Sequence, residues 1–149
     1  MADLTVTTTD SVTLQGRKYG NEHTTTITGV NNVVHAVSVV PNATQFNVFS
    51  FGSSTQGFSQ FVASDLKYMR FTNTDATNSV FLTITNDEGT GSAPDDYANL
   101  EIPAGTSFVV FAGQLKVHGS ATFTINDMYR LQARATGGDV IMDMFIATA

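Results

Sequence analysis

Three histidines and two pairs of adjacent carboxylates are the residues of this chain whose types could support acid–base or metal chemistry. The histidines are His23, His35 and His118. Nucleophilic catalysis needs a base beside the nucleophile and a third group that orients the base. None of the three lies in a recognisable nucleophile elbow, and His35 alternates with valines in VVHAVSVV, which is typical of a strand. We therefore expect no catalytic residue, and we expect that the protein is not an enzyme.

The acidic pairs, Asp87-Glu88 and Asp95-Asp96, both lie in the segment NDEGTGSAPDD. Two carboxylates in different environments can act as acid and base, and an oxygen-rich loop can hold calcium. The EF-hand spacing is absent, and adjacent acids in a loop with glycine and proline are typical of a solvated surface. Whether this loop binds calcium stays open, but we expect no metal site.

Cofactor chemistry also lacks a sequence signal. The chain has no cysteine, which excludes a thiolate metal site and a thiol nucleophile. It has no phosphate-binding or dinucleotide-binding glycine pattern, and GSSTQG is not followed by a helix that could hold phosphate at its N-terminus. We expect no cofactor.

Composition restricts the partners. Charged residues make up 13% of the 149 residues, the formal net charge is -6, and the seven Lys and Arg are scattered except for Arg17-Lys18. Such a chain has no basic stripe for a phosphate backbone, so nucleic acid is not expected as a partner.

No apolar run has the length of a membrane span, and MADLTVTTTD lacks the features of a secretion signal. We expect synthesis in the cytoplasm and no membrane partner.

The elements that must position any site are strands. Apolar residues recur with a period of two, Val, Ile, Thr, Phe and Tyr dominate these stretches, and turn residues separate them at short intervals. The expected strands are 4–8, 11–14, 24–30, 33–40, 44–51, 66–73, 79–85, 98–102, 107–111, 115–118, 121–125, 129–135 and 139–147. This pattern predicts an all-β protein whose core is a β-sandwich, with a jelly roll as the preferred form and an immunoglobulin-like sandwich as the alternative. Residues 1–14 could form an extended arm, which leaves 15–149 as a single β-sandwich domain.

Several expected strands carry apolar side chains on both faces. They are Thr44–Phe51, Ser79–Thr85 and Ser107–Phe111. A sheet face that meets solvent is normally polar, so a loop, an added strand or a neighbouring subunit must cover the second face. The candidate interaction residues are the outward members of these strands together with two residues of the arm: Leu4, Val6, Phe49, Phe51, Phe81, Val109 and Phe111.

Long stretches of the chain share a style with one known class of proteins. They are the Thr-rich beginning ADLTVTTTDSVTL, the pattern LKYMRFTNTDATNSVFLTIT followed by LEIPAGTSFVVF, and the ending GGDVIMDMFIATA. In these features the chain resembles the small β-rich structural proteins of tailed bacteriophages, in particular capsid cement or decoration proteins. The resemblance contains no diagnostic motif, so it assigns no role to any single residue.

The resemblance implies a jelly roll or similar sandwich that forms a homotrimer on the outside of a head shell and ties neighbouring capsomers together. Its partners would be the major capsid protein and other copies of itself, and its place would be the capsid surface of the virion after synthesis in the host cytoplasm. Two alternatives remain. One is a tail, neck or fibre component of a phage, and the other is a carbohydrate-binding module that uses Tyr19, Tyr97 or Phe58 with the acidic segment 86–97.

Overall fold

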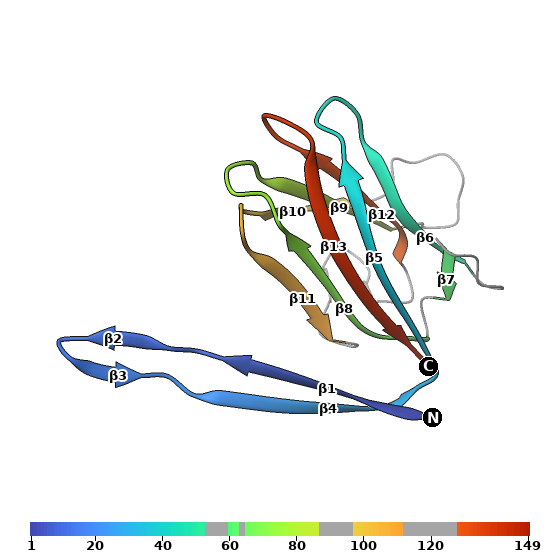
Figure 1. Cartoon of the computed structure of the whole chain (residues 1–149). Coiled ribbons are helices and arrows are strands. Elements are labelled where there is room, and N and C mark those ends of the chain that lie inside the picture. Colours follow the sequence, from blue (N-terminus) through green and yellow to red (C-terminus); the bar gives the residue numbers. More distant parts are fainter. Residues whose placement is uncertain (53–59, 63–64, 87–96, 112–127) are drawn as a thin grey trace.

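A computed structural model describes residues 1–52, 60–62, 65–86, 97–111 and 128–149 of the chain. In these ranges the regular structure consists of strands (Figure 1). They are β1 (Ala2–Thr9), β2 (Val12–Leu14), β3 (Arg17–Tyr19), β4 (Glu22–Val30), β5 (Asn32–Val40), β6 (Phe46–Gly52), β7 (Gln60–Val62), β8 (Leu66–Asn73), β9 (Val80–Asn86), β10 (Tyr97–Ile102), β11 (Ser107–Phe111), β12 (Met128–Ala135) and β13 (Val140–Thr148).

Two sheets pack face to face to form a β-sandwich (Figure 1). One has the order β11-β8-β13-β5 and is called sheet C here, and the other has the order β10-β9-β12-β6-β7 and is called sheet D. All neighbours are antiparallel except β6 and β7, which are parallel. The all-β sandwich predicted from the sequence is confirmed, while the jelly-roll form stays a prediction. The strands expected at 115–118 and 121–125 lie outside the described residues.

The period of two places one apolar row of each strand between the sheets. In β9, Val80, Leu82 and Ile84 are buried, and in β13, Met142 and Met144 are buried. Aromatic rings join the two layers, because Phe49 of sheet D lies between Phe61 and Phe71 of the core, at ring-centroid distances of 5.4 and 5.9 Å. These residues form one continuous core.

A β-bulge in β6 explains one of the strands that carry apolar groups on both faces. Asn47 pairs with Gln132 and Phe49 with Leu131, so Val48 is an extra residue in β6. The bulge lets Val48 and Phe49 both face the core, where Phe49 is 2% exposed. The sequence expectation that Phe49 points outward to a partner is therefore wrong, because it assumed unbroken alternation along this strand.

The N-terminal arm is a long two-stranded ribbon that projects beyond the edge of the sandwich (Figure 1). β1 pairs with β4, and β2 pairs with β3 farther out along the same ribbon. Gln15 and Gly16 close the hairpin with φ of 51° and 76°, the positive values that a two-residue turn of type I′ requires. The arm thus runs from Ala2 to Val30, whereas the sequence suggested residues 1–14 and placed the strand at 24–30 in the sandwich.

The base of the arm packs against the outer face of sheet C, the face turned away from sheet D. Val30, Tyr68 and Ala147 are buried together there, and further apolar side chains from both parts surround them. Those are Leu4, Val6 and Ile27 from the arm, and Phe111 and Phe145 from the sheet. This second apolar cluster anchors one end of the ribbon to the sandwich.

Candidate functional site: the arm tip and the outer faces of the two sheets

The tip of the arm presents three large apolar side chains to solvent. Val12 is 57% exposed, Leu14 61% and Tyr19 51%. Val12 pairs with Tyr19 and Leu14 with Arg17, and alternation puts Val12 and Leu14 on one face, so all three apolar side chains share that face of the ribbon. We call Val12, Leu14 and Tyr19 the tip patch. An isolated two-stranded ribbon is only marginally stable in water, and an uncovered apolar face at its end makes the tip patch a candidate binding surface.

Backbone packing determines where the tip begins. The amide of Asp10 donates a hydrogen bond to the carbonyl oxygen of Asn21 over 2.9 Å, which bridges the gap between the two paired parts of the ribbon. Beside it, Gly20 has φ of 141°, and a Cβ atom at this position would collide with the backbone carbonyl of Asp10. Only glycine lets the two chains approach so closely. The ribbon therefore stays paired from its base to the tip patch.

A second uncovered apolar area lies on the outer face of sheet C, toward the end of β5. Val37 is 63% exposed, Val39 58% and Ile141 52%. Val39 of β5 and Ile141 of β13 are direct register partners, and Val37 pairs with Asp143 on the same two strands. We call Val37, Val39 and Ile141 the sheet patch. Since β5 is the last strand of its sheet in the described chain, this area also borders a sheet edge, where partners commonly bind.

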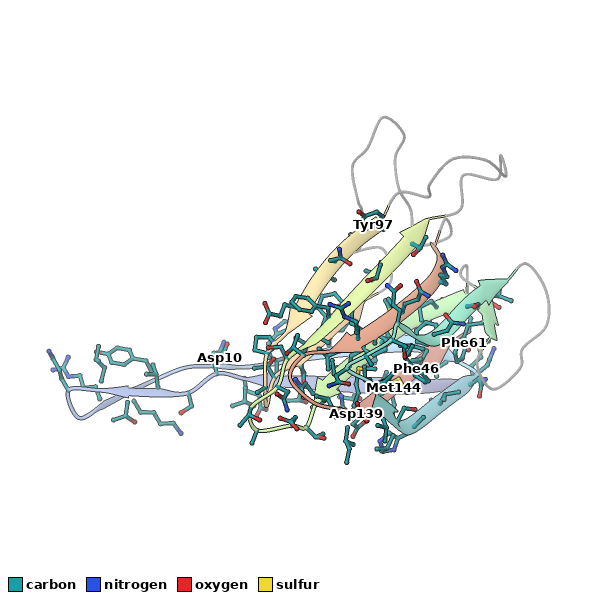
Figure 2. The ribbon with its side chains drawn as sticks, turned by 90° about the horizontal axis from the view of Figure 1, so that it is seen from above. Asp10, Phe46, Phe61, Tyr97, Asp139 and Met144 are labelled. Carbon is teal, nitrogen blue, oxygen red and sulfur yellow. The ribbon has the colours of Figure 1, made fainter. Side chains whose placement is uncertain are left out.

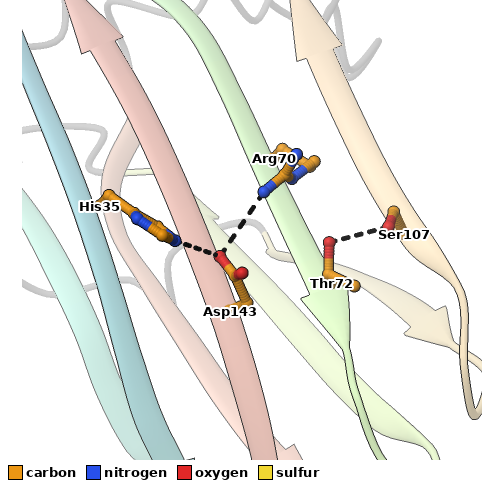
Figure 3. A network of polar contacts seen from close by, with 5 residues as sticks. All are labelled: His35, Arg70, Thr72, Ser107 and Asp143. Carbon is orange, nitrogen blue, oxygen red and sulfur yellow. Dashed lines mark hydrogen bonds and ion pairs between the residues drawn. The ribbon is translucent and has the colours of Figure 1, made fainter. Parts of the chain in front are cut away.

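A polar group of His35, Arg70 and Asp143 lies on the outer face of sheet C (Figure 3). The imidazole Nε2 of His35 is 3.1 Å from Asp143 Oδ1, and Arg70 Nη2 is 3.6 Å from the same oxygen. The Arg70 guanidinium also lies 5.9 Å from the centre of the Phe145 ring. These contacts tie β5, β13 and β8 together across the outer face.

The same outer face carries two side-chain hydroxyls, either of which could act as a nucleophile if His35 lay beside it as a base. Thr72 Oγ1 and Ser107 Oγ are 2.8 Å apart and share a hydrogen bond between β8 and β11 (Figure 3). His35 makes its contact with Asp143 on the other side of β8. A nucleophile must lie within hydrogen-bond reach of its base. The arrangement thus pairs hydroxyl with hydroxyl and imidazole with carboxylate, so His35 is not the hydrogen-bond partner of either hydroxyl.

The outer face of sheet D has a different character. An open groove of about 410 Å³ lies over it, lined by Gln45, Thr83, Thr85, Tyr97, Asn99, Arg130 and Gln132. Gln45 Nε2 donates to Thr83 Oγ1 over 3.2 Å, and Thr83 Oγ1 donates to Asn99 Oδ1 over 2.7 Å. Tyr97 stands at the end of β10 with 67% of its surface exposed, at the opposite end of the sandwich from Asp139 (Figure 2). The amides, the hydroxyls, the exposed ring and the Arg130 guanidinium of this lining suit a polar ligand that accepts hydrogen bonds.

The other residues expected at an interface have different places. Leu4 and Val6 contact the sandwich of their own chain, and Phe111 is part of the same cluster beside Tyr68, at a ring-centroid distance of 5.3 Å. Val109 is 38% exposed on the outer face of sheet C, and Phe81 is half-buried on the outer face of sheet D. Phe51 belongs to β6, and its side chain lies outside the described residues.

Sequence reasoning missed both patches, the tip patch and the sheet patch. The signal for the sheet patch was present, because VVHAVSVV carries valines on both faces and meets the criterion applied to the other strands. The tip patch gave a weaker signal, because VTL and RKY are short and flank a turn. Of the aromatic residues considered for sugar binding, Tyr19 belongs to the tip patch, Tyr97 lines the groove, and Phe58 lies outside the described residues.

The residues considered for metal chemistry do not converge where the structure describes them. His23 is exposed on β4 and His35 is on sheet C, while His118 and the acidic pairs lie outside the described residues. Within the described ranges, no three His, Asp or Glu side chains are grouped so that they could hold a metal ion. The same ranges contain no helix long and apolar enough to cross a membrane.

Comparisons with protein families, with curated protein sequences and with solved structures found no match to this chain. The arm, the two patches and the groove are therefore the features from which a function is proposed.

Proposed function

We propose that this protein is a non-enzymatic structural protein that holds an assembly together through its arm. The observation that carries the proposal is the tip patch, an apolar face at the free end of a ribbon that projects from the sandwich (Figure 1). Burial of apolar surface stabilises protein association, and an arm with such a face is suited to reach a neighbouring subunit. A largely neutral surface, with only 13% charged residues, adds little cost of charge desolvation to such contacts.

The setting that we propose is the virion of a tailed bacteriophage, where the protein would be a capsid cement or decoration protein on the head shell. The support is the resemblance in sequence style, together with a two-layer sandwich that exposes apolar area on one sheet. Its partners would be the major capsid protein and other copies of itself, in a homotrimer. A tail, neck or fibre component would need the same arm and patches, and imaging of the particle would distinguish these locations.

The experiment is size-exclusion chromatography with light scattering on the full chain, followed by cosedimentation with phage heads stripped of their outer proteins. We expect a mass of about three times the 15.9 kDa of one chain, and retention on the heads. A Val12→Asp and Leu14→Asp double variant should lose assembly, head binding or both. Thr13→Asp, on the opposite face of the tip, is the matched control and should keep both. A stable monomer without affinity for heads would contradict the proposal.

A second candidate function is glycan binding, which the groove over sheet D favours. Sugar hydroxyls are bound by amides and hydroxyls such as those of Gln45, Thr83 and Asn99, and an exposed ring such as that of Tyr97 can pack on the apolar face of a pyranose. Arg130 also lines the groove, and a guanidinium can donate hydrogen bonds to sugar hydroxyls. The groove thus offers both kinds of contact within one concave surface.

A glycan array probed with the full chain tests this second function. If the groove binds a sugar, Tyr97→Ala should abolish the signal, while Tyr19→Ala at the arm tip should leave it intact. Arrays with and without calcium would show whether the acidic segment takes part. Silence under both conditions would remove this function and leave the structural one untouched.

A further inference from the structure

We propose that the tip patch of one copy docks on the sheet patch of a second copy, so that each arm links its own sandwich to the next one. The inference rests on the proposed structural function, and it names the partner and the surface that the arm uses. It selects another copy of this chain, rather than a shell protein, as the occupant of the sheet patch.

The tip patch cannot be covered by the sandwich of its own chain. Leu4, Val6 and Ile27 hold the base of the ribbon against the sandwich. From Val6 to Leu14 the ribbon continues for eight residues, or about 26 Å at roughly 3.3 Å per residue. Two views at right angles show the outer part of the arm directed away from the body of the protein, with Asp10 already beyond the sandwich (Figures 1 and 2). The tip patch is therefore not covered by its own sandwich and is open to a second molecule.

The outer face of sheet C is a surface that already accepts this ribbon. At one end of the face, the apolar row of the arm base covers Tyr68, Ala147 and Phe145 within the same chain. The sheet patch continues the face along the same strands, since Phe145 and Ile141 both lie on the outer side of β13 and Val39 faces Ile141. One end of the face is thus occupied by the chain's own arm, and the other end offers the same chemistry uncovered.

The two patches also match in charge. Residues 12–19 contain Arg17 and Lys18 and no acidic residue, although the whole chain carries -6. Arg17 pairs with Leu14 and so lies beside the tip patch. Two carboxylates flank the sheet patch, Asp139 two residues before Ile141 and Asp143 two residues after it. Asp143 is already paired with Arg70 and contacts His35, so Asp139, which accepts a hydrogen bond from the Asn42 amide, is the carboxylate without a cationic partner among these contacts. The Arg17 guanidinium beside an apolar tip and the Asp139 carboxylate beside an apolar sheet area are complementary in charge.

The contact joins two different surfaces, so it is heterologous. Such contacts close into rings when the rotation between copies permits it. A ring of three copies would use every tip patch and every sheet patch once. This agrees with the homotrimer proposed above and leaves the groove over sheet D free.

Cysteine cross-linking tests the docking. The chain has no native cysteine, so only the introduced cysteines can form disulfides. Copies that carry Leu14→Cys are mixed with copies that carry Val39→Cys or Ile141→Cys, oxidised, and separated on a non-reducing gel, with the linked peptides identified by mass spectrometry. All three positions are exposed, so the variants should fold, which circular dichroism checks. We expect a mixed dimer, because a disulfide forms only when two Cβ atoms come within about 4 Å.

Two controls define the outcome. Thr13→Cys, on the opposite face of the tip, should link to Val39→Cys at least several-fold less, and Leu14→Cys should not link to Glu101→Cys, which is exposed on sheet D. An oligomer that shows no preference for the sheet patch would overturn the docking and leave the proposed function standing. A monomer that still binds phage heads would also overturn the docking and leave the proposed function standing. A monomer that binds no heads would overturn both the docking and the proposed function.

Discussion

Phe49 of β6 and Phe71 of β8 stack on each other across the sandwich, with ring centroids 5.9 Å apart and planes inclined by 23°. Phe49 also meets the edge of Phe61 at 5.4 Å. This relationship joins sheet D to sheet C at the centre of the core. It gives Phe49 a role in stability rather than in partner binding.

Phe49→Ala should lower the free energy of unfolding by about 3 to 5 kcal/mol, because the truncation removes a buried ring and leaves a cavity between the sheets. Urea denaturation of the full chain measures the change. Phe81→Ala, which truncates a half-buried ring on the outer face of sheet D, is the matched control and should cost clearly less. If both variants lost the same small amount, the central place of Phe49 would be contradicted.

The case of Phe49 shows what the sequence can predict and where the prediction ends. Alternation correctly predicted the inward row Val80, Leu82 and Ile84 and the all-β architecture. It could not predict the bulge at Val48, because an inserted residue changes the face of everything after it and leaves no mark in the composition.

The pairing of β1 with β4 in the arm could not be predicted from the sequence either. A period of two is the same in a free ribbon and in a sandwich strand, so β4 looked like a strand of the core. Its partner is set by the turn at Gln15-Gly16, which returns the chain along β1, and by the close approach of Gly20 to Asp10. The sheet patch was visible in VVHAVSVV, but the outward face of β5 could be known only from its register with β13, in which Val39 pairs with Ile141 and Val37 with Asp143.

Stability at low pH should depend on Asp75 in the turn between β8 and β9. Its carboxylate accepts hydrogen bonds from the backbone amides of Asn78 and Thr77, over 2.7 and 2.8 Å, and from the Thr77 hydroxyl. These bonds, that of Asn78 foremost, lower the pKa of Asp75 below its ordinary value of 3.8. A lowered pKa means that the folded state holds the charged form more strongly, so this stabilisation is present above 3.8 and lost as the pH falls through the lowered pKa.

Urea unfolding of the wild type and of Asp75→Asn as a function of pH checks this expectation. The wild type should be the more stable above about pH 5, and the difference should shrink as the pH falls below the ordinary pKa of aspartate, about 3.9. Thr77→Val keeps both backbone donors and should show a smaller effect. A difference that stays constant from pH 6 to pH 2 would show that the carboxylate charge plays no part.

Tyr68 should report on the attachment of the arm. Burial in the second apolar cluster raises the pKa of its phenol above the ordinary 10.0, against a smaller opposing effect of Arg70. The folded state therefore favours the neutral phenol, and its contribution is present below pH 10 and lost as the pH rises through the raised pKa. As the pH rises past 10.0, wild-type stability should fall more steeply than that of Tyr68→Phe.

Absorbance of the phenolate at 295 nm, followed during a pH titration, provides the matching measurement. Ile27→Ala removes part of the arm that packs on this cluster, so it should return the pKa of Tyr68 toward its ordinary value. Val12→Ala at the arm tip, far from the cluster, should leave the titration unchanged. Identical titrations for all three proteins would mean that the arm base does not cover Tyr68 in solution.

Gly20→Ala should break the arm between its base and its tip. The new Cβ atom would collide with the carbonyl of Asp10, and the φ of 141° is one that alanine rarely adopts. The strands must separate there, so amide hydrogen exchange over residues 10–21 should speed up, and assembly through the tip patch should fall. The melting temperature of the sandwich should stay close to that of the wild type.

Gly16→Ala is the control for this prediction. Its φ is 76° and a Cβ atom there would have no atom within 4 Å, so the substitution adds only the strain of a left-handed residue, about 1 to 2 kcal/mol. If exchange in Gly20→Ala matched that of Gly16→Ala, the close approach of Asp10 and Gly20 would not be what holds the tip in place.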